Sequence, residues 1–343
     1  MRRRARPSPE HRPVRRSSGP RPPLALPLVV LGLGVFLLVL APLLAWYVEP
    51  RAQRTPVDID TTTVFTGTGT YFDTERIEPV SGKKLTITRQ VRGDVADSER
   101  SGRAVWDVST SVDSDKSLPA ADPHDSLQWT VERWVTDRRT NKPVHCCQEE
   151  PYFEGEAYLK FPFDVQKRSY IWWDNTLGST VTLKYDGKKR IQGYEGLKFT
   201  GTVPATKTGT RLVPGSLVGV EDVGQVLAEE WYANHGIELV ADQRTGRIIY
   251  AAIGPRKTLR APGGEEDAVT LLDSKRIAFD TETQKEQVEL ADSDSGLLRL
   301  VGRTLPLVAG ITGFVLAVTG AVLVARRRPR PEAHESSQQS LTM

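Results

Sequence analysis

Two long apolar runs lie near the ends of the 343-residue chain. Residues 24–48 read LALPLVVLGLGVFLLVLAPLLAWYV and residues 305–325 read LPLVAGITGFVLAVTGAVLVA, and neither run contains Asp, Glu, Lys or Arg. Each run reaches the roughly 20 residues that an α-helix needs to cross the hydrocarbon core of a bilayer. The sequence therefore predicts two transmembrane helices, which separate two tails from a long middle segment.

Arginine residues flank both apolar runs on their outer sides. Eight arginines precede residue 22 and four follow residue 325, whereas the rest of the chain holds more acidic than basic residues. Because positively charged flanks stay in the cytoplasm, we expect a two-pass protein of the plasma membrane, with both termini cytoplasmic and residues 49–304 extracytoplasmic. The acidic middle argues against a nucleic-acid partner, which would require clustered Lys and Arg.

A cleaved signal peptide is the alternative interpretation of the first apolar run. The apolar region of a signal peptide spans only about 7–15 residues, and this run is longer. It also ends with Trp46 and Tyr47, residue types that are enriched at membrane interfaces. We therefore expect an uncleaved anchor.

In the middle segment, apolar and polar residues mostly alternate. Trp106, Val108 and Val112 share one face of an extended chain, with Asp and Ser residues on the other face. Leu127 and Val131 likewise fall on one face of the next such segment. This alternation is typical of antiparallel strands with one face in water. The predicted fold class is a mainly antiparallel β ectodomain between two transmembrane α-helices.

Two segments of the ectodomain resemble each other. VTDRRTNKPV begins at residue 135 and VADQRTGRII begins at residue 240, which places Asn141 and Gly246 at equivalent positions. Both residue types tolerate φ > 0 in a tight turn. The similarity indicates either two duplicated β-rich modules or two hairpins that match by chance, and both interpretations remain open.

The predicted organisation has seven parts. These are a disordered basic cytoplasmic tail (1–23), a transmembrane helix (24–48), β-rich module 1 (49–150), β-rich module 2 (151–280), a partly helical connector (281–304), a second transmembrane helix (305–325) and a disordered cytoplasmic tail (326–343). The tails lack the apolar residues of a core, and the connector is rich in helix formers.

Aromatic residues are densest in YLKFPFDVQKRSYIWWDNTLG, residues 158–178. Large aromatic side chains dominate both protein cores and ligand pockets. They either fill the core between two modules or line an apolar cavity or groove that binds a ligand. The candidate ligand-binding residues are Phe161, Phe163, Tyr170, Trp172 and Trp173.

Several phrases of the sequence resemble a known protein family. FPFDVQKRSYIWWDNTLG, LKYDGKKRIQGYEGLKFTGTVP and DQRTGRI occur in this order. The chain is similar to the porin PorA family, two-pass membrane proteins of actinobacteria whose extracytoplasmic domain has no known function. The resemblance covers most of the chain and implies a cell-envelope location. It implies no reaction and no catalytic residues.

The family's porin label does not fit the strand pattern. A membrane β-barrel needs strands of about 10 residues with an unbroken apolar outer face, whereas the segment 104–113 carries Asp and Ser on its second face. The chain also has two apolar helices, which cannot line a pore unless several copies assemble. A channel is therefore expected only as an oligomer.

Signatures of enzymes, cofactors and metal sites are missing. The sequence contains neither H-E-x-x-H nor G-x-S-x-G. DSDSG, which begins at Asp292, resembles the start of a calcium loop, but Arg303 stands where that loop requires Glu. We expect no catalytic residues, no cofactor and no metal site.

Cys146 and Cys147 are the only cysteines, and they are adjacent. Outside the cytoplasm a disulfide can persist, but adjacent Cα atoms lie about 3.8 Å apart, closer than the usual 4.4–6.8 Å of a bridge. A vicinal disulfide would therefore be strained and easily reduced. Two inert thiols, a metal ligand pair and an intermolecular bridge remain alternatives.

These features together favour a binding function rather than a reaction. We expect a membrane-anchored cell-envelope protein whose ectodomain binds a membrane lipid or another hydrophobic envelope component non-covalently. The alternatives are a structural or scaffolding protein that contacts a membrane protein partner and has no ligand, or an oligomeric channel component.

Overall fold

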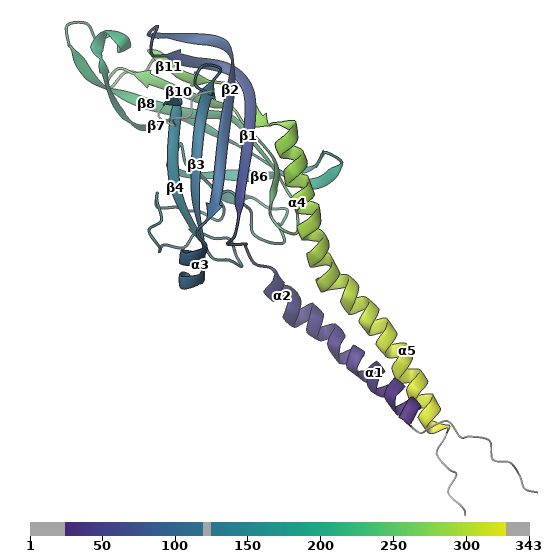
Figure 1. The fold of residues 1–343 in the computed structure, drawn as a ribbon. Helices are drawn as coiled ribbons and strands as arrows, with labels where there is room; N and C mark the ends of the chain where they lie inside the picture. Colours follow the sequence, from purple (N-terminus) through teal and green to yellow (C-terminus); the bar gives the residue numbers. More distant parts are fainter. Residues whose placement is uncertain (1–24, 119–124, 327–343) are drawn as a thin grey trace, which may run out of the picture. The chain divides into compact units, whose positions relative to one another are not determined.

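The computed structural model describes residues 25–118 and 125–326 (Figure 1). The chain divides into two compact units. One unit comprises the segments up to Tyr47 and from Val301 onward, and the other comprises residues 48–300. The predictions of disordered tails fall almost entirely on residues 1–23 and 327–343, which lie outside the described residues.

The first unit is helical. α1 (Ala25–Leu43) continues as a short π-helix (Leu44–Val48), and α5 (Leu305–Ala325) follows a second π-helix (Leu300–Thr304). By length and composition, the helical stretches Leu26–Ala52 and Thr281–Ala325 can each cross a membrane. Both apolar runs of the sequence therefore form helices.

Glycines bring α1 and α5 into backbone contact. A Cβ on Gly34 of α1 would lie 2.3 Å from the backbone nitrogen of Ala317, and a Cβ on Gly320 of α5 would lie 2.6 Å from that of Leu31. No side chain fits in so little space. The two helices therefore pack through small residues, as helix pairs in membranes commonly do.

Within its described residues, the second unit is built on one sheet of twelve strands, and every pair of these strands is antiparallel. The prediction of a mainly antiparallel β fold is confirmed. The strands are β1 (Asp60–Asp73), β2 (Glu78–Gly93), β3 (Ala104–Ser114), β4 (Gln128–Thr136), β5 (Tyr170–Asp174), β6 (Ser179–Ile191), β7 (Tyr194–Pro214), β8 (Gln225–Ala241), β9 (Ile248–Ile253), β10 (Pro255–Arg260), β11 (Val269–Asp273) and β12 (Ile277–Phe279).

Three short helices and one long helix also belong to the described part of this unit. The short ones are α2 (Glu49–Ala52), α3 (Val95–Ser101) and a 3₁₀ helix (Gly215–Val218), and the long one is α4 (Thr281–Arg299). α3 begins at Asp94, whose side chain accepts the Asp97 amide. Asp280 caps α4 in the same way by accepting the Thr283 amide. Such caps satisfy amides that have no partner inside the helix. The predicted partly helical connector begins with α4.

Two strands, β1 and β8, change their pairing partner along their length. The sheet order is β4-β3-β2-β1-β11-β10-β8-β7-β6-β5. Outside this order, β12 pairs with β1 and β9, and β9 also pairs with β8. A Cβ on Gly69 of β1 would lie 2.4 Å from the carbonyl oxygen of Asp273. A Cβ on Gly254, between β9 and β10, would lie 2.8 Å from that of Lys275. Glycine thus permits the close backbone approach at both places where the partner changes.

The sheet is curled, so that its two end strands, β4 and β5, lie close to each other. β4 and β5 stand at opposite ends of the strand order. Nevertheless, the side-chain amide of Asn175, directly after β5, donates to Glu132 of β4 at 2.5 Å. From the middle of the sheet, Lys257 of β10 donates to Gln128 of β4, also at 2.5 Å. The two ends of the sheet therefore come together around an interior.

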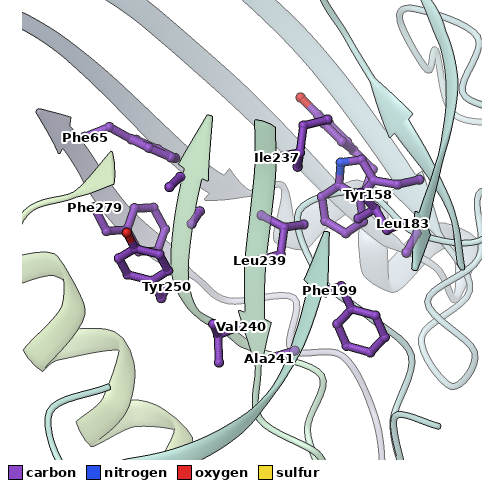
Figure 2. Close-up of a cluster of buried hydrophobic side chains, with 14 of the residues drawn as sticks. Phe65, Tyr158, Leu183, Phe199, Ile237, Leu239, Val240, Ala241, Tyr250 and Phe279 are labelled. Carbon is purple, nitrogen blue, oxygen red and sulfur yellow. The ribbon is translucent and has the colours of Figure 1, made fainter. Parts of the chain in front are cut away.

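That interior holds one large hydrophobic core (Figure 2). It joins residues of the first strands, such as Phe65 and Ile87, with residues of the last, such as Leu239 and Phe279. A smaller cluster around Leu259 and Val269 is separate from it. Because strands from both predicted modules share one sheet and one core, the structure does not show the two-module duplication.

The alternating apolar residues lie on the buried face of β3 but on the exposed face of β4. In β3, Trp106 and Val108 face the core and are almost fully buried. In β4, the apolar residue Val131 faces outward and is 58% exposed, and Leu127, directly before the strand, is 38% exposed. The inward positions of β4 hold polar residues that bind partners across the interior. Apolar alternation therefore does not identify the buried face of this strand.

Candidate functional site

The five predicted aromatic residues lie at different depths. Phe161, Tyr170, Trp172 and Trp173 are buried in the large core. Phe163 is only partly buried, and the Lys160 ammonium lies 3.9 Å from the centre of its ring. The structure therefore brings four of the five residues into the interior.

Direct ring contacts connect these buried residues. The ring of Phe161 lies 5.2 Å from those of Tyr170 and Trp172, and 4.7 Å from that of Phe199 in β7. Trp173 instead contacts Phe153 at 5.6 Å. These are ordinary packing distances between aromatic rings. In this structure the four rings form a filled core rather than the lining of an open cavity.

Three further aromatic residues belong to the same cluster and were not among the five candidates, although one of them, Tyr158, lies in the aromatic stretch 158–178. Trp134 of β4 lies 5.9 Å from Tyr158, and Tyr158 lies 5.2 Å from Phe153. All three are buried. A signal for Trp134 is present in the sequence of β4, QWTVERWVT, because Trp134 is the one aromatic residue on the strand face that otherwise carries polar side chains.

An irregular segment, residues 143–165, connects the two end strands of the sheet. We call it the strap. On the β4 side, Glu150 exchanges two backbone hydrogen bonds with Arg133, of 2.7 and 3.0 Å. On the β5 side, the Glu156 amide donates to Ile171, and the Trp173 amide donates to Ala157. The strap therefore bridges the gap that the sheet leaves open, and it does so without a strand of its own.

The strap also fills the interior beneath it. Phe153, Tyr158 and Phe161 belong to the strap, whereas Trp134 and Trp172 belong to the end strands. In this cluster, strap aromatics thus pack against strand aromatics. If the strap moved away, the aromatic side chains of β4 and β5 would lose their cover.

The two similar turns recognised in the sequence hold the far end of the strap. Asn141 and Gly246 both adopt φ > 0, at 56° and 74°. The Asn141 side chain donates to the Lys160 carbonyl at 2.6 Å, and the Phe161 amide donates to the Gly246 carbonyl at 2.9 Å. The turns share one geometry because Asp137 and Asp242 each accept the amide three residues later.

Buried polar groups border the aromatic cluster. The Tyr158 hydroxyl donates to Glu132 at 2.5 Å, and the Tyr232 hydroxyl donates to Asp174 at 3.1 Å. Burial raises the pKa of the Asp174 carboxyl, and it raises the pKa values of both phenols. The indole N–H of Trp134 is buried and has no acceptor within the described part of the chain. The interior therefore combines apolar surface with a few oriented polar groups.

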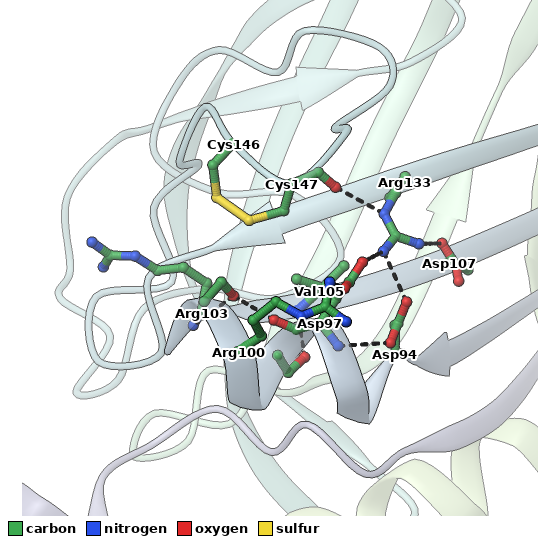
Figure 3. A network of polar contacts seen from close by, with 11 residues as sticks. Asp94, Asp97, Arg100, Arg103, Val105, Asp107, Arg133, Cys146 and Cys147 are labelled. Atoms are coloured by element: carbon green, nitrogen blue, oxygen red, sulfur yellow. Dashed lines mark hydrogen bonds and ion pairs between the residues drawn. A yellow bond between two sulfur atoms is a disulfide. The ribbon is translucent and has the colours of Figure 1, made fainter.

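Cys146 and Cys147 are joined by a disulfide bond in the strap (Figure 3). The Cys147 carbonyl accepts a hydrogen bond from Nε of Arg133 at 2.9 Å. The remaining guanidinium nitrogens of Arg133 bind three carboxylates, those of Asp94, Asp97 and Asp107, at 2.5–2.8 Å. The Asp97 amide and Arg133 together hold the pKa of Asp94 below its ordinary value. Arg133 thus fastens the disulfide loop to β3, β4 and α3.

A pocket of ≈ 270 Å³ opens at another place in the same unit. It is lined by residues 200–202 of β7, residues 235–238 of β8, and Lys275 and Arg276. None of the five predicted aromatic residues contributes to it. Across residues 25–118 and 125–326, no group of three or more His, Cys, Asp or Glu side chains is arranged to hold a metal ion.

Two helices that can cross a membrane and a compact antiparallel sheet indicate a membrane protein with a β-rich domain. The family model described as Porin PorA matches residues 26–322. The chain therefore belongs to the Porin PorA family, which confirms the resemblance noted in the sequence. The comparison with curated proteins gives no match.

Proposed function

We propose that the chain is a membrane-anchored cell-envelope protein whose β-rich unit binds a lipid or another apolar envelope component without catalysing a reaction. The observation that carries the proposal is that the strap, rather than a strand, closes the aromatic interior between β4 and β5. The proposed site is the space that Phe153, Tyr158 and Phe161 of the strap now fill.

The energetic argument concerns replacement of one apolar surface by another. Burial of apolar surface contributes about 25 cal/mol per Å², so an acyl chain beside Trp134 and Trp172 would recover much of what the strap aromatics lose on leaving. The backbone hydrogen bonds of the strap are scattered over β4, β5 and the turn after β8, whereas a strand is held by a continuous ladder along its length. Local opening of such a segment requires less free energy than loss of a strand.

The polar groups support the same location. Ligand sites combine a mostly apolar lining with a few oriented polar groups. The unpartnered indole N–H of Trp134 can donate to a carboxyl or hydroxyl oxygen of a ligand. Glu132 and Asp174 lie nearby and already accept hydrogen bonds from tyrosine hydroxyls.

A structural or scaffolding protein without a ligand is the second candidate, with a membrane protein as its partner. The close ring contacts around Phe161 favour it, because they leave the aromatic cluster already filled. An oligomeric channel is the third candidate, in keeping with the family's description. In such a channel the aqueous path would run between copies, since the aromatic cluster of each chain is packed.

The proposed placement is a two-pass protein of the plasma membrane, with both termini cytoplasmic and residues 49–304 extracytoplasmic. The arginine flanks of the two apolar runs support it. Alkaline phosphatase inserted at the exposed turn near Gly263 should be active, and green fluorescent protein at the C-terminus should fluoresce. The opposite pair of results would contradict this orientation.

The binding proposal is tested with the full chain in lipid nanodiscs and a brominated fatty acid, which quenches nearby tryptophan fluorescence. We expect saturable quenching that weakens in Trp172→Phe, because Trp172 lines the interior. Trp129→Phe is the matched control, because Trp129 is 39% exposed on the outer face of β4. Equal quenching losses in the two variants, or no saturable quenching, would favour the scaffolding function.

A further inference from the structure

We infer that the Cys146–Cys147 bridge is a thiol–disulfide exchange site, and that its reduction by a dithiol loosens the strap. Loosening the strap would admit the apolar ligand, so the functional meaning of the inference rests on the proposed function. The exchange reaction itself depends only on the loop and on its attachment to β4.

The bridge is accessible, and the backbone beside it is held in an uncommon conformation. Cys146 and Cys147 are partly rather than fully buried, and the next residue, Gln148, is exposed. Cys147 and Gln148 adopt φ values of 59° and 60°. Residues other than glycine adopt this left-handed conformation only uncommonly. Contacts around the loop must therefore maintain it.

Two sets of contacts maintain the loop. Arg133 binds the Cys147 carbonyl and exchanges backbone hydrogen bonds with Glu150, on the other side of Gln148. Within the loop, the His145 ring stacks on Tyr152 at 3.9 Å, and its Nδ1 lies 2.7 Å from Glu149. The disulfide supplies the covalent restraint, because it fixes the chain direction between His145 and Gln148.

The exchange proceeds by two displacements at sulfur. A thiolate of the dithiol attacks one sulfur of the bridge and forms a mixed disulfide, and the other cysteine leaves as a thiolate that takes up a proton. The second thiol of the reagent then closes its own disulfide and releases the remaining cysteine. Two electrons and two protons pass from the dithiol to Cys146 and Cys147.

Reduction removes one restraint and leaves the others in place. Cys147 and Gln148 can then return to negative φ, which turns the Cys147 carbonyl away from Arg133. Arg133 keeps its three carboxylate partners, so β3, β4 and α3 remain joined. The change is therefore confined to the strap, which loosens from its β4 end while the turns at Asn141 and Gly246 retain its far end.

Hydrogen–deuterium exchange of the full chain in nanodiscs, with and without dithiothreitol, tests this inference. Alkylation and intact mass should show two modified cysteines only after reduction. We expect amide exchange of residues 143–158 to accelerate about tenfold on reduction, while residues 179–191 of β6 stay unchanged. A double Cys146→Ser, Cys147→Ser variant should exchange rapidly in both conditions.

Three results would overturn the inference. The first is alkylation of both cysteines without reductant, and the second is a bridge that dithiothreitol does not reduce in the folded protein. The third is full reduction with unchanged exchange in the strap.

The brominated fatty acid separates this inference from the proposed function. Faster strap exchange without quenching in either redox state would uphold the exchange site and reject the ligand. Quenching that is equal in both states, together with unchanged strap exchange, would uphold the ligand and reject the exchange site.

Discussion

At the residue scale, Glu132 shows how a polar side chain is accommodated in an aromatic interior. Its carboxylate is almost fully buried and accepts from Tyr158 and from Asn175, both at 2.5 Å. A buried carboxylate is tolerated when hydrogen-bond donors replace the water that it loses. The residues that supply these donors come from the strap and from the end of β5, so Glu132 stabilises the closed arrangement.

Tyr158→Phe removes one of these donors and keeps the ring. We expect it to lower the free energy of unfolding of the β-rich unit by about 1.5–3 kcal/mol, the usual range for hydrogen bonds to charged groups. Urea unfolding followed by tryptophan fluorescence measures the change. Tyr152→Phe removes the same hydroxyl from a ring that is 59% exposed, and it should have almost no effect. Equal losses in the two variants would contradict the role given to Tyr158.

Burial of Lys257 makes the stability of the β-rich unit depend on pH in a defined direction. Burial lowers its pKa from 10.5 to about 8, although Glu230 and Asp174 oppose the shift. Between about pH 8 and 10.5 the unfolded chain binds more protons at this residue, so stability should rise with pH by at most about 1.4 kcal/mol per unit. Below pH 8 both states are protonated, and the contribution is constant.

Lys257→Met should remove this rise. Urea unfolding at several pH values from 7 to 11 compares the variant with the unchanged protein. The difference between the two curves isolates Lys257 from the tyrosines that titrate in the same window. Parallel curves would show that Lys257 keeps an ordinary pKa in the folded state.

At the element scale, the turn at Gly246 joins the strap to the hairpin of β8 and β9. Gly246 has φ of 74°, and a Cβ there would lie 2.2 Å from the Phe161 carbonyl oxygen. Gly263 has a similar φ of 72°, but a Cβ there would meet nothing within 4 Å. The two glycines therefore share the conformational requirement and differ in their surroundings.

Gly246→Ala should consequently be more destabilising than Gly263→Ala. Both variants carry the cost of about 1–2 kcal/mol for a left-handed alanine, and only the first also displaces the strap. The urea midpoints of the two variants measure the difference directly. Similar midpoints would mean that the strap adapts to the added methyl group without loss.

Glycine also defines the pairing of α1 with α5. Gly34→Leu would place a side chain where Ala317 now lies, whereas Gly32→Leu adds the same side chain where a Cβ meets nothing within 4 Å. A photo-crosslinking amino acid in place of Leu37, whose Cβ lies 2.9 Å from where a Cβ on Gly313 of α5 would be, should react with α5 in the unchanged protein and in Gly32→Leu. The crosslink should be lost in Gly34→Leu, and its retention would contradict the glycine contact.

Sequence patterns predicted some elements well and others poorly. The alternation in β3 identified its buried face because apolar residues there meet an apolar interior. The same reasoning fails for β4, where Gln128 and Glu132 face inward and bind Lys257 and Tyr158. Partners more than 100 residues away in sequence, such as Lys257 for Gln128, leave no local signal. Burial of a polar strand face cannot be predicted without them.

At the scale of the whole molecule, composition predicted the two apolar helices and the β class, because both depend on local patterns. The closure of the sheet was not predictable, since it requires β4 and β5 to meet across the strap. The aromatic density of residues 158–178 pointed to the interior correctly. It could not distinguish rings that pack on one another from rings that line a cavity, because that depends on where Trp134 and Phe199 lie.

The glycine contact between α1 and α5 has a consequence for ion conduction. It directs small residues of the two helices toward each other, so helix contacts between copies within the membrane would use the remaining helix faces. Those faces present bulky hydrocarbon side chains such as Phe36, Ile311 and Phe314, which are 59–66% exposed. A passage between copies would offer no oxygen ligands from charged side chains in place of the water around an ion. Such a hydrophobic constriction tends to empty of water, so a conducting state would require the helices to separate and rotate.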